Sequence, residues 1–364
     1  MTYRSPVTGR PLVADTPHSL AAPGERWPVV DGIPYLRTDS EGLVAVALDH
    51  LDADCPDDAL VALLTDQDAW WTGPATDLGE LKRLVRERDT LSLRAAMALL
   101  RMGPVADYFA HRWSDPTYLA GLALVEAHWR EPGTAFELAC GIGHYLRELS
   151  ARGVACVGAD VVFSKCWLAK HWVAPAADYV VFDAAGRWPV ETQQFDLVAC
   201  HDAFYFLPDQ PRVAGLLRET VAPGGVLAVS HLHNAAVAGG AMGPARTSDE
   251  WATLFPAAIA YDERELRRAL LASDAPVPTG WFDDPGTEAW SIIETDAGAP
   301  RTLTGGLAMP VANAVLQPNP LLEGDTPRWP SDRYRVEYGS AATWLSDTGD
   351  AARNRRVVDL PPRW

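Results

Sequence analysis

The chain has 364 residues, more than one ordinary domain needs, and its 48% hydrophobic and 22% charged residues are a globular balance. No run approaches the roughly 18 apolar residues that a membrane span requires, and the start, MTYRSPVTGR, lacks the apolar core of a signal peptide. The formal net charge of −17 would repel a polyanion. We therefore expect a cytoplasmic protein that binds neither membranes nor nucleic acid.

The chain has five cysteines, and none of them forms a C-x-x-C pair. Four of the five lie in or beside predicted buried elements, so we read them as core thiols in a reducing compartment. Lysine occurs only three times against many arginines, which indicates the codon bias of a GC-rich bacterial genome.

The first 40 residues contain SPVTGRPL and then RWPVVDGIPYLR, in which the Asp31-Gly32 pair is typical of a hairpin turn. This stretch resembles the small zinc-ribbon domain that accompanies some RNA and protein methyltransferases, with the pattern C-P-x-C-x-G-x-L and later Y-P-V-x-D-G-I-P-x-L. Ser5 and Thr8 stand where its first two cysteines would be, and hydroxyls do not hold structural zinc. We therefore expect a β-rich module over residues 1–40 without zinc.

Residues 41–115 have apolar side chains three and four positions apart in DDALVALLTD, LGELKRLVRERD and LSLRAAMALLRMGPVADYFAHRW. This spacing predicts helices. We expect a helical insertion, and the resemblance to methyltransferases implies that it forms a lid over the substrate. For its aromatic residues a core or interface role is favoured over lining the substrate; they are Trp70, Trp71, Tyr108 and Trp113.

The stretch TAFELACGIGHYLREL, residues 134–149, reads as a buried strand, a turn at Gly141 and Gly143, and a helix. Glycines at such a turn let the backbone approach a ligand closely. Leu146 occupies the place of the third glycine of a dinucleotide motif. Instead Glu137 precedes the turn, giving E-x-x-x-G-x-G, which resembles the first motif of the class I S-adenosylmethionine-dependent methyltransferases.

Four later blocks follow in the order and spacing of that family. VACVGADV supplies a second strand that ends on Asp160, nineteen residues after Gly141, where nucleotide-binding folds place a carboxylate for the ribose. DYVVFDAAGRWPV, QQFDLVACHDAFYFLPD and VAPGGVLAVSHLHN then supply the third to fifth strands. The blocks run from about residue 135 to residue 234, little more than a quarter of the chain.

The resemblance implies an α/β fold with a Rossmann-like, mostly parallel, seven-stranded sheet and helices on both faces, over residues 116–310. It also implies S-adenosylmethionine as cofactor, with Asp160 on its ribose and the segment at Asp183 along its adenine. The residues that it places at the cofactor are Glu137, Ala139, Gly141, Gly143, His144, Asp160, Val161, Asp183, Ala184 and His201.

The remaining residues, 235–364, carry local patterns only. Residues 235–248 are glycine-rich and predict a loop. TEAWSIIETD (residues 287–296) and PRTLTGGLAMP (residues 300–310) are candidates for the last two strands. Residues 311–364 form an extension that wraps the core or mediates contacts in a homodimer, and its ending suggests a loosely ordered tail.

Three histidines are the candidate catalytic residues. His201 ends the predicted fourth strand, and His231 and His233 lie two apart at the end of the fifth, so an extended backbone points them to one face. Histidine suits general-base work on a hydroxyl or amine. Two alternatives stay open: structural histidines at strand ends, or a divalent metal site that uses H-x-H with the His201-Asp202 pair. We expect no bound metal.

The sequence thus favours an S-adenosylmethionine-dependent methyltransferase that acts on a small molecule or natural product, with the methylated atom open. Methylation of a protein or RNA is the first alternative, which the zinc-ribbon resemblance favours and the charge and missing cysteines oppose. The second is a catalytically silent methyltransferase fold that serves as a scaffold, because such folds recur without activity.

Overall fold

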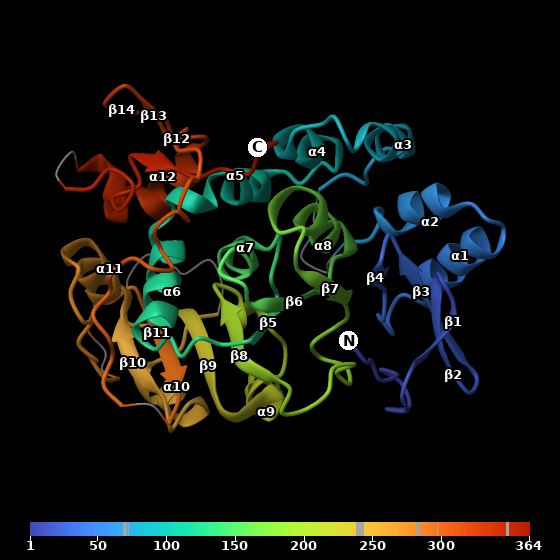
Figure 1. Ribbon diagram of the computed structural model, residues 1–364, viewed down its shortest axis with the longest axis horizontal. Helices are drawn as coiled ribbons and strands as arrows, with labels where there is room; N and C mark the ends of the chain where they lie inside the picture. The colour runs from blue at the N-terminus through green and yellow to red at the C-terminus, as the bar shows by residue number, and fades with distance from the viewer. Residues whose placement is uncertain are drawn as a thin grey trace.

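The computed structural model describes residues 1–67, 71, 73–237, 244–281, 284, 286–296, 298–346 and 349–364. Trp70 and residues 238–243 of the predicted glycine-rich loop lie outside these ranges. A central sheet runs across the molecule, with helices above and below it and a small second sheet at one side (Figure 1). Within the described ranges, no helix combines the length and hydropathy needed to cross a membrane.

The central sheet has seven strands in the order β10-β11-β9-β8-β5-β6-β7. The five strands from β5 to β9 are parallel, and β11 is antiparallel to both β9 and β10. This confirms the predicted mostly parallel, seven-stranded sheet. The strands are β5 Thr134–Leu138, β6 Ala155–Asp160, β7 Asp178–Val181, β8 Phe195–His201, β9 Val221–His233, β10 Ile259–Asp262 and β11 Ala289–Glu294.

Helices cover both faces of this sheet (Figure 1). α6 is fully buried between the sheet and its neighbours, and it begins where the Asp115 carboxylate accepts a hydrogen bond from the Thr117 amide. One face carries α6 Pro116–Ala127, α7 His144–Ser150, α8 Phe163–Leu168 with the π-helical turn Ala169–Val173, and α11 Glu263–Ala272; the other carries α9 Gln210–Thr220 and α10 Ser248–Leu254.

One predicted strand was wrong. Residues 287–296 do contain β11, but residues 300–310 form turns, and the remaining strand is β10, on the N-terminal side of α11. The Glu126 carboxylate accepts hydrogen bonds from the amides of Gly305 at 2.7 Å and Leu307 at 2.8 Å. These amides are therefore committed to a side chain and not to a neighbouring strand.

The N-terminal sheet is antiparallel, in the order β1-β2-β3-β4, as expected for a β-rich module. Its strands are β1 Val13–Thr16, β2 Ser19–Ala22, β3 Glu25–Val30 and β4 Ile33–Pro34. Ser5 Oγ accepts hydrogen bonds from the amides of Val7 at 3.1 Å and Thr8 at 2.9 Å, and donates to the Glu25 carboxylate. Hydrogen bonds thus hold the turn at the positions where the zinc-ribbon pattern has its first two cysteines.

Within the described ranges, five α-helices separate the N-terminal sheet from α6: α1 Glu41–Asp52, α2 Pro56–Leu63, α3 Leu78–Glu87, α4 Leu93–Leu99 and α5 Pro104–His111. α3 and α4 begin at side-chain caps from Asp77 and Ser92. Trp113 is buried in the large apolar cluster beneath them, so its role is packing.

The C-terminal extension contains α12 Asp332–Tyr338 and four short strands, β12 Gln317–Pro318, β13 Leu322–Glu323, β14 Thr326–Pro327 and β15 Val357–Val358. The expectation of a loosely ordered tail was wrong. The Leu93 amide donates to the Arg363 carbonyl at 2.6 Å, and the Trp364 indole donates to the Ala110 carbonyl at 2.7 Å. The tail is held because the backbone of Arg363 and the side chain of Trp364 form hydrogen bonds to α4 and α5.

Candidate functional site

The carboxyl end of β5 leads into the predicted glycine turn. Ala139, Gly141 and Gly143 have positive φ angles of 55°, 53° and 81°, a region that suits glycine because it has no Cβ. At Gly143 a Cβ would lie 3.0 Å from the hydroxyl of Tyr179. The turn is built for residues without side chains, and Ala139 occupies it with backbone strain.

Glu137 lies in β5 with its side chain buried. Its Oε2 atom has no hydrogen-bond partner among the described residues. Burial raises the pKa of this carboxyl well above its ordinary range. Buried polar atoms without a partner are rare, so this oxygen near the glycine turn fits a site that a polar ligand completes.

Asp160 ends β6 and ties the glycine turn to the loop after that strand. Its carboxylate accepts hydrogen bonds from the Gly141 amide at 3.1 Å and the Val162 amide at 3.0 Å. Lys165 Nζ lies 3.5 Å from Oδ1. A carboxylate has about four lone-pair sites, so capacity remains for the hydroxyls of a ribose.

The segment after β7 is held from below by α9. The Asp183 carboxylate accepts from the Ala185 amide at 2.9 Å. Arg212 donates to the carbonyls of Ala185 at 2.8 Å and Gly186 at 2.6 Å, and the Trp188 indole donates to the Ala184 carbonyl at 3.0 Å. These bonds fix the backbone of the stretch that the sequence assigns to the adenine.

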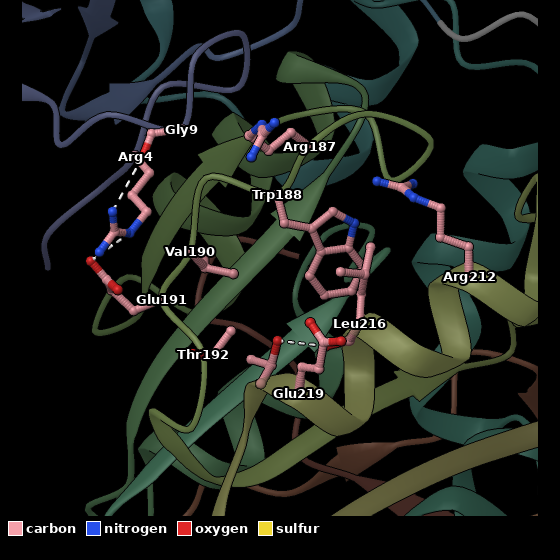
Figure 2. Close-up of a pocket in the computed structure, with 11 residues that line it drawn as sticks. Arg4, Gly9, Arg187, Trp188, Val190, Glu191, Thr192, Arg212, Leu216 and Glu219 are labelled. Carbon is pink, nitrogen blue, oxygen red and sulfur yellow. Dashed lines mark hydrogen bonds and ion pairs between the residues drawn. The ribbon is translucent and has the colours of Figure 1, made fainter.

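A cavity of about 540 Å³ lies between this segment, α9 and the N-terminal module (Figure 2). Arg187 and Arg212 flank one side of it, and Glu219 lies on the other (Figure 2). None of the residues that line it belongs to the predicted cofactor set. It is therefore separate from the glycine turn.

His144 begins α7 and points to the helices above it. Its Nε2 lies 2.9 Å from the Phe109 carbonyl in α5, and its ring centroid is 4.6 Å from that of Trp113. Burial lowers the pKa of His144 to about 3. The neutral ring therefore joins α5 to the glycine turn.

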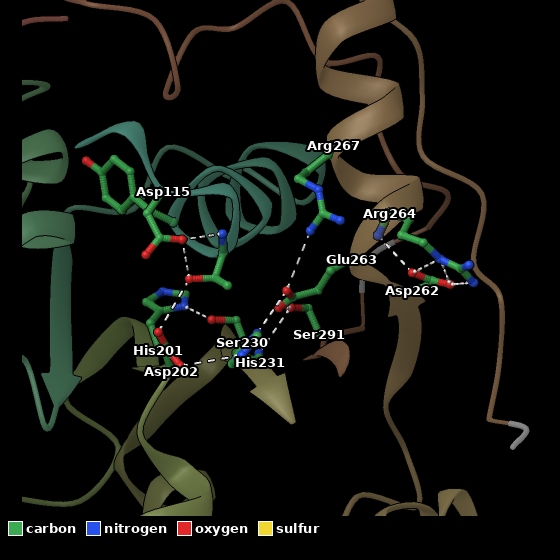
Figure 3. A network of polar contacts seen from close by, with 12 residues as sticks. Asp115, His201, Asp202, Ser230, His231, Asp262, Glu263, Arg264, Arg267 and Ser291 are labelled. Carbon is green, nitrogen blue, oxygen red and sulfur yellow. Dashed lines mark hydrogen bonds and ion pairs between the residues drawn. The ribbon is translucent and has the colours of Figure 1, made fainter. Parts of the chain in front are cut away.

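The carboxyl ends of β8 and β9 carry a buried polar network (Figure 3). Asp202 lies at its centre and follows β8 with a φ of 51°. Its carboxylate accepts from the hydroxyls of Tyr108 and Tyr205, each at 2.9 Å, and pairs with Arg112 at 2.9 Å. Burial alone would raise the pKa of Asp202, but His231, Arg112 and these hydroxyls hold it below its ordinary value.

The three histidines differ in their surroundings. His201 Nδ1 lies 2.9 Å from Ser230 Oγ, and its ring stacks on Tyr145 with centroids 3.9 Å apart. Burial, with Arg112 nearby, lowers the pKa of His201 to about 3. The ring is therefore neutral at ordinary pH and fixed by two neighbours.

His231 is held by two carboxylates (Figure 3). Its Nδ1 lies 3.0 Å from Glu263 Oε2, and its Nε2 lies 3.9 Å from Asp202 Oδ1. Burial opposes the charge, but Glu263 and Asp202 outweigh it and raise the pKa of His231 to about 10. His231 is therefore an imidazolium at neutral pH.

His233 differs from the other two histidines in one respect: its buried Nε2 atom has no hydrogen-bond partner among the described residues. Its ring centroid lies 4.6 Å from that of His231 and 4.3 Å from that of Tyr205. The two β9 histidines thus share a face as predicted, although a β-bulge opposite Ser291 interrupts the strand, with a φ of 61° at His231. Burial lowers the pKa of His233 to about 4.

Sequence reasoning missed two members of this network, Arg112 and Glu263. Arg112 comes at the end of α5, and its only local signal is Asp115 three positions later, with which it also pairs at 3.0 Å. Glu263 begins α11 and comes to His231 from the opposite side (Figure 3). Within the described ranges, no three His, Cys, Asp or Glu side chains are grouped to hold a metal ion.

Residues 136–229 match the family model of a methyltransferase domain. Together with the strand order, this match identifies the core as a class I S-adenosylmethionine-dependent methyltransferase fold. The core therefore contains an S-adenosylmethionine-dependent methyltransferase domain, for which S-adenosylmethionine is the cofactor.

Several solved structures are similar to parts of the chain. A complex of the Haloferax volcanii Trm112 methyltransferase activator and a putative methyltransferase matches at 17% identity over 57% of this chain and 98% of the other, with a TM-score of 0.41. A TehB-like methyltransferase from Corynebacterium glutamicum matches at 18% over 54% and 100%, with a TM-score of 0.38. CalS10, an amino pentose methyltransferase from Micromonospora echinaspora, matches at 23% over 32% and 50%, with a TM-score of 0.28. No curated protein sequence matches the chain.

Proposed function

We propose that this methyltransferase acts on a small molecule, such as a natural product. The observation that carries the proposal is the roof, by which we mean α5 with α12. Tyr108 of α5 bonds Asp202 directly, and its ring lies 6.4 Å from that of Tyr338 in α12. A macromolecular acceptor would have to displace these two helices to reach the Asp202 network, which favours a small acceptor.

The cofactor residues proposed are those of the motif positions, with Glu137, Gly141 and Gly143 at the turn, Asp160 at the ribose and Asp183 at the adenine. S-adenosylmethionine supplies an activated methyl group, so the protein has to bind it, align the acceptor and exclude water. We also propose that the chain has four parts. These are an N-terminal module (residues 1–40), a helical lid (residues 41–115), the methyltransferase core (residues 116–310) and a C-terminal extension (residues 311–364).

His233 is the general base in this proposal. Its Nε2 is neutral, buried and without a hydrogen-bond partner among the described residues, so it can accept a proton from an acceptor hydroxyl or amine. His231 carries a proton already and instead orients the face that the two rings share. His201 contacts Ser230 and stacks on Tyr145, so in this proposal it only lines the site.

The test is methyl transfer from labelled S-adenosylmethionine to a panel of small hydroxyl and amine acceptors, with bulk protein and RNA as separate arms. We expect turnover on a small acceptor, lowered about 100-fold or more in His233→Ala with cofactor affinity retained. His128→Ala is the matched control, because His128 is also buried with a pKa lowered by burial, but it bonds Tyr261 instead. Transfer to protein or RNA alone would refute the proposal.

Each of the two alternative functions, a macromolecular acceptor and a silent scaffold, has an observation in its favour or a distinct expected result. The N-terminal module resembles a partner domain of RNA and protein methyltransferases, which favours a macromolecular acceptor. A silent scaffold would bind the cofactor without turning it over. The methyl-transfer assay separates these alternatives when calorimetry is added. A scaffold would bind S-adenosylhomocysteine in the calorimeter and would transfer no methyl group to small molecules, protein or RNA.

A further inference from the structure

The N-terminal module is joined to the core by backbone pairing at the edge strand β7. The Leu36 amide donates to the Val181 carbonyl at 2.7 Å, and Tyr35 forms a parallel bridge with Val181. The Tyr35 ring also meets the ring of Phe163 at the start of α8, with centroids 6.2 Å apart. The module therefore lies against the segment between β6 and α8.

Arg37 follows this junction directly and is buried. Its Nη1 donates to Asp66 Oδ1 at 2.8 Å and to the Val161 carbonyl at 3.1 Å. Its Nε donates to Asp39 Oδ1 at 2.9 Å. One guanidinium thus joins three parts of the chain: the N-terminal module, the end of α2 and the loop after β6.

Residues 161–163 follow β6, and we call them the cofactor loop. From the inner side Asp160 accepts its Val162 amide and also the Gly141 amide of the glycine turn. From the outer side Arg37 holds the Val161 carbonyl, and Asp66 Oδ2 lies 3.4 Å from the Phe163 amide. The loop is therefore clamped between the ribose carboxylate and the Arg37–Asp66 pair.

We infer that Arg37 is a positioning residue for the cofactor, and that through it the N-terminal module belongs to the cofactor site of the same chain. The inference rests on the cofactor residues proposed above. Arg37 does not touch the cofactor; it fixes the carbonyl next to Asp160. Displacing such a support by about 1 Å is enough to cost much of a site's function.

Arg37→Gln tests this, with S-adenosylhomocysteine as the calorimetric probe. We expect affinity to fall about tenfold or more, the effect of one hydrogen bond to a charged group. The amides of Val162 and Phe163 should also exchange hydrogen faster than in the wild type. Both readouts report on the cofactor loop, so a general loss of stability does not reproduce them.

Arg26→Gln is the matched control. Arg26 lies in β3 of the same module and also reaches the helical insertion, pairing with Asp52 at 2.6 Å and with Asp15 at 2.8 Å, but the described contacts of Arg26 do not include the cofactor loop. We expect its affinity to stay within about twofold of wild type, since exposed pairs contribute little. An equal loss in both variants would overturn the inference, because the module would then act only through stability.

Arg37→Lys keeps the test decisive if Arg37→Gln does not fold. Lysine keeps the charge beside Asp66 but lacks the fork that reaches Asp39 and Val161 together. Weaker binding in a folded Arg37→Lys supports the inference, and wild-type affinity in any folded Arg37 variant overturns it. If the wild-type protein itself fails to bind the probe, the cofactor assignment fails instead.

Discussion

Nδ1 of His231 and Oε2 of Glu263 lie 3.0 Å apart, and both side chains are buried. The pair brings the end of β9 to the start of α11 and leaves a charged imidazolium beside Asp202. Breaking one half of such a pair strands the other charge in the interior. The state of the whole network therefore depends on this contact.

The first prediction concerns that pair. His231→Gln should lower the free energy of unfolding by about 3 to 5 kcal/mol, because Glu263 loses its nearest charged partner and keeps only the more distant Arg267, at 3.9 Å, and the Ser291 hydroxyl. Adding Glu263→Gln should restore part of the loss, since neither charge is then buried alone. Urea unfolding of both variants measures this. Additive losses in the double variant would show that the two side chains do not interact.

The second prediction follows from the raised pKa of His231. Its pKa is about 10 in the folded chain against about 6.5 when unfolded, so the folded state holds the proton more tightly. The stabilisation is complete below about pH 6.5 and is lost as pH rises toward 10. Relative to His231→Gln, the wild type should lose stability across that window. A constant difference between the two proteins from pH 6 to pH 10 would contradict the assignment.

The third prediction is on the pH profile of turnover. His233 has a pKa of about 4, so it is already neutral at pH 6. If His233 is the base, kcat/KM should not change with pH above about pH 6 and should fall only under acid conditions. A rise in kcat/KM centred near pH 10 that vanishes in His231→Gln would instead assign the base to His231.

The fourth prediction is that Asp160→Ala weakens the binding of S-adenosylmethionine and S-adenosylhomocysteine by about 1.5 to 3 kcal/mol. Asp196→Ala is the control. Asp196 likewise accepts backbone amides, from Gly133 at 2.8 Å and Thr134 at 3.0 Å, but at the opposite end of β5. Calorimetry should separate the two, and equal affinities in both variants would remove Asp160 from the site.

The fifth prediction is that the N-terminal module holds no zinc. Metal analysis of protein purified without chelator should find none in stoichiometric amount, and chelator should leave the Tm unchanged. Ser5→Ala should lower stability by about 1 to 2 kcal/mol, because two amides and Glu25 lose a partner. Zinc bound by N-terminal ligands would contradict this.

The sequence predicted those parts of the fold that have local signals. The five parallel strands and the glycine turn follow from short apolar runs and from the need for positive φ at Gly141 and Gly143. β10 was missed because it has four residues and no distinctive period, whereas residues 300–310 carry an apolar pattern that Glu126 holds in turns.

The chemistry of the candidate site was less readable. The order of the strands places His201, His231 and His233 at one edge, and this could be inferred. The protonation of each depends on partners far along the chain, above all Glu263 for His231 and the absence of a described partner for His233 Nε2. Arg112 reaches Asp202 across ninety positions, and no local pattern reports such a contact.

The bridge between Tyr35 and β7 also bears on how the protein behaves when it is cut. β7 ends the central sheet, and the Val181 carbonyl is covered only because Leu36 donates to it. A chain that begins after residue 40 would leave this edge open, and exposed strand edges pair with other chains and aggregate. Shortened versions that keep only the core should therefore precipitate, and a proline or lysine placed on β7 should improve their solubility.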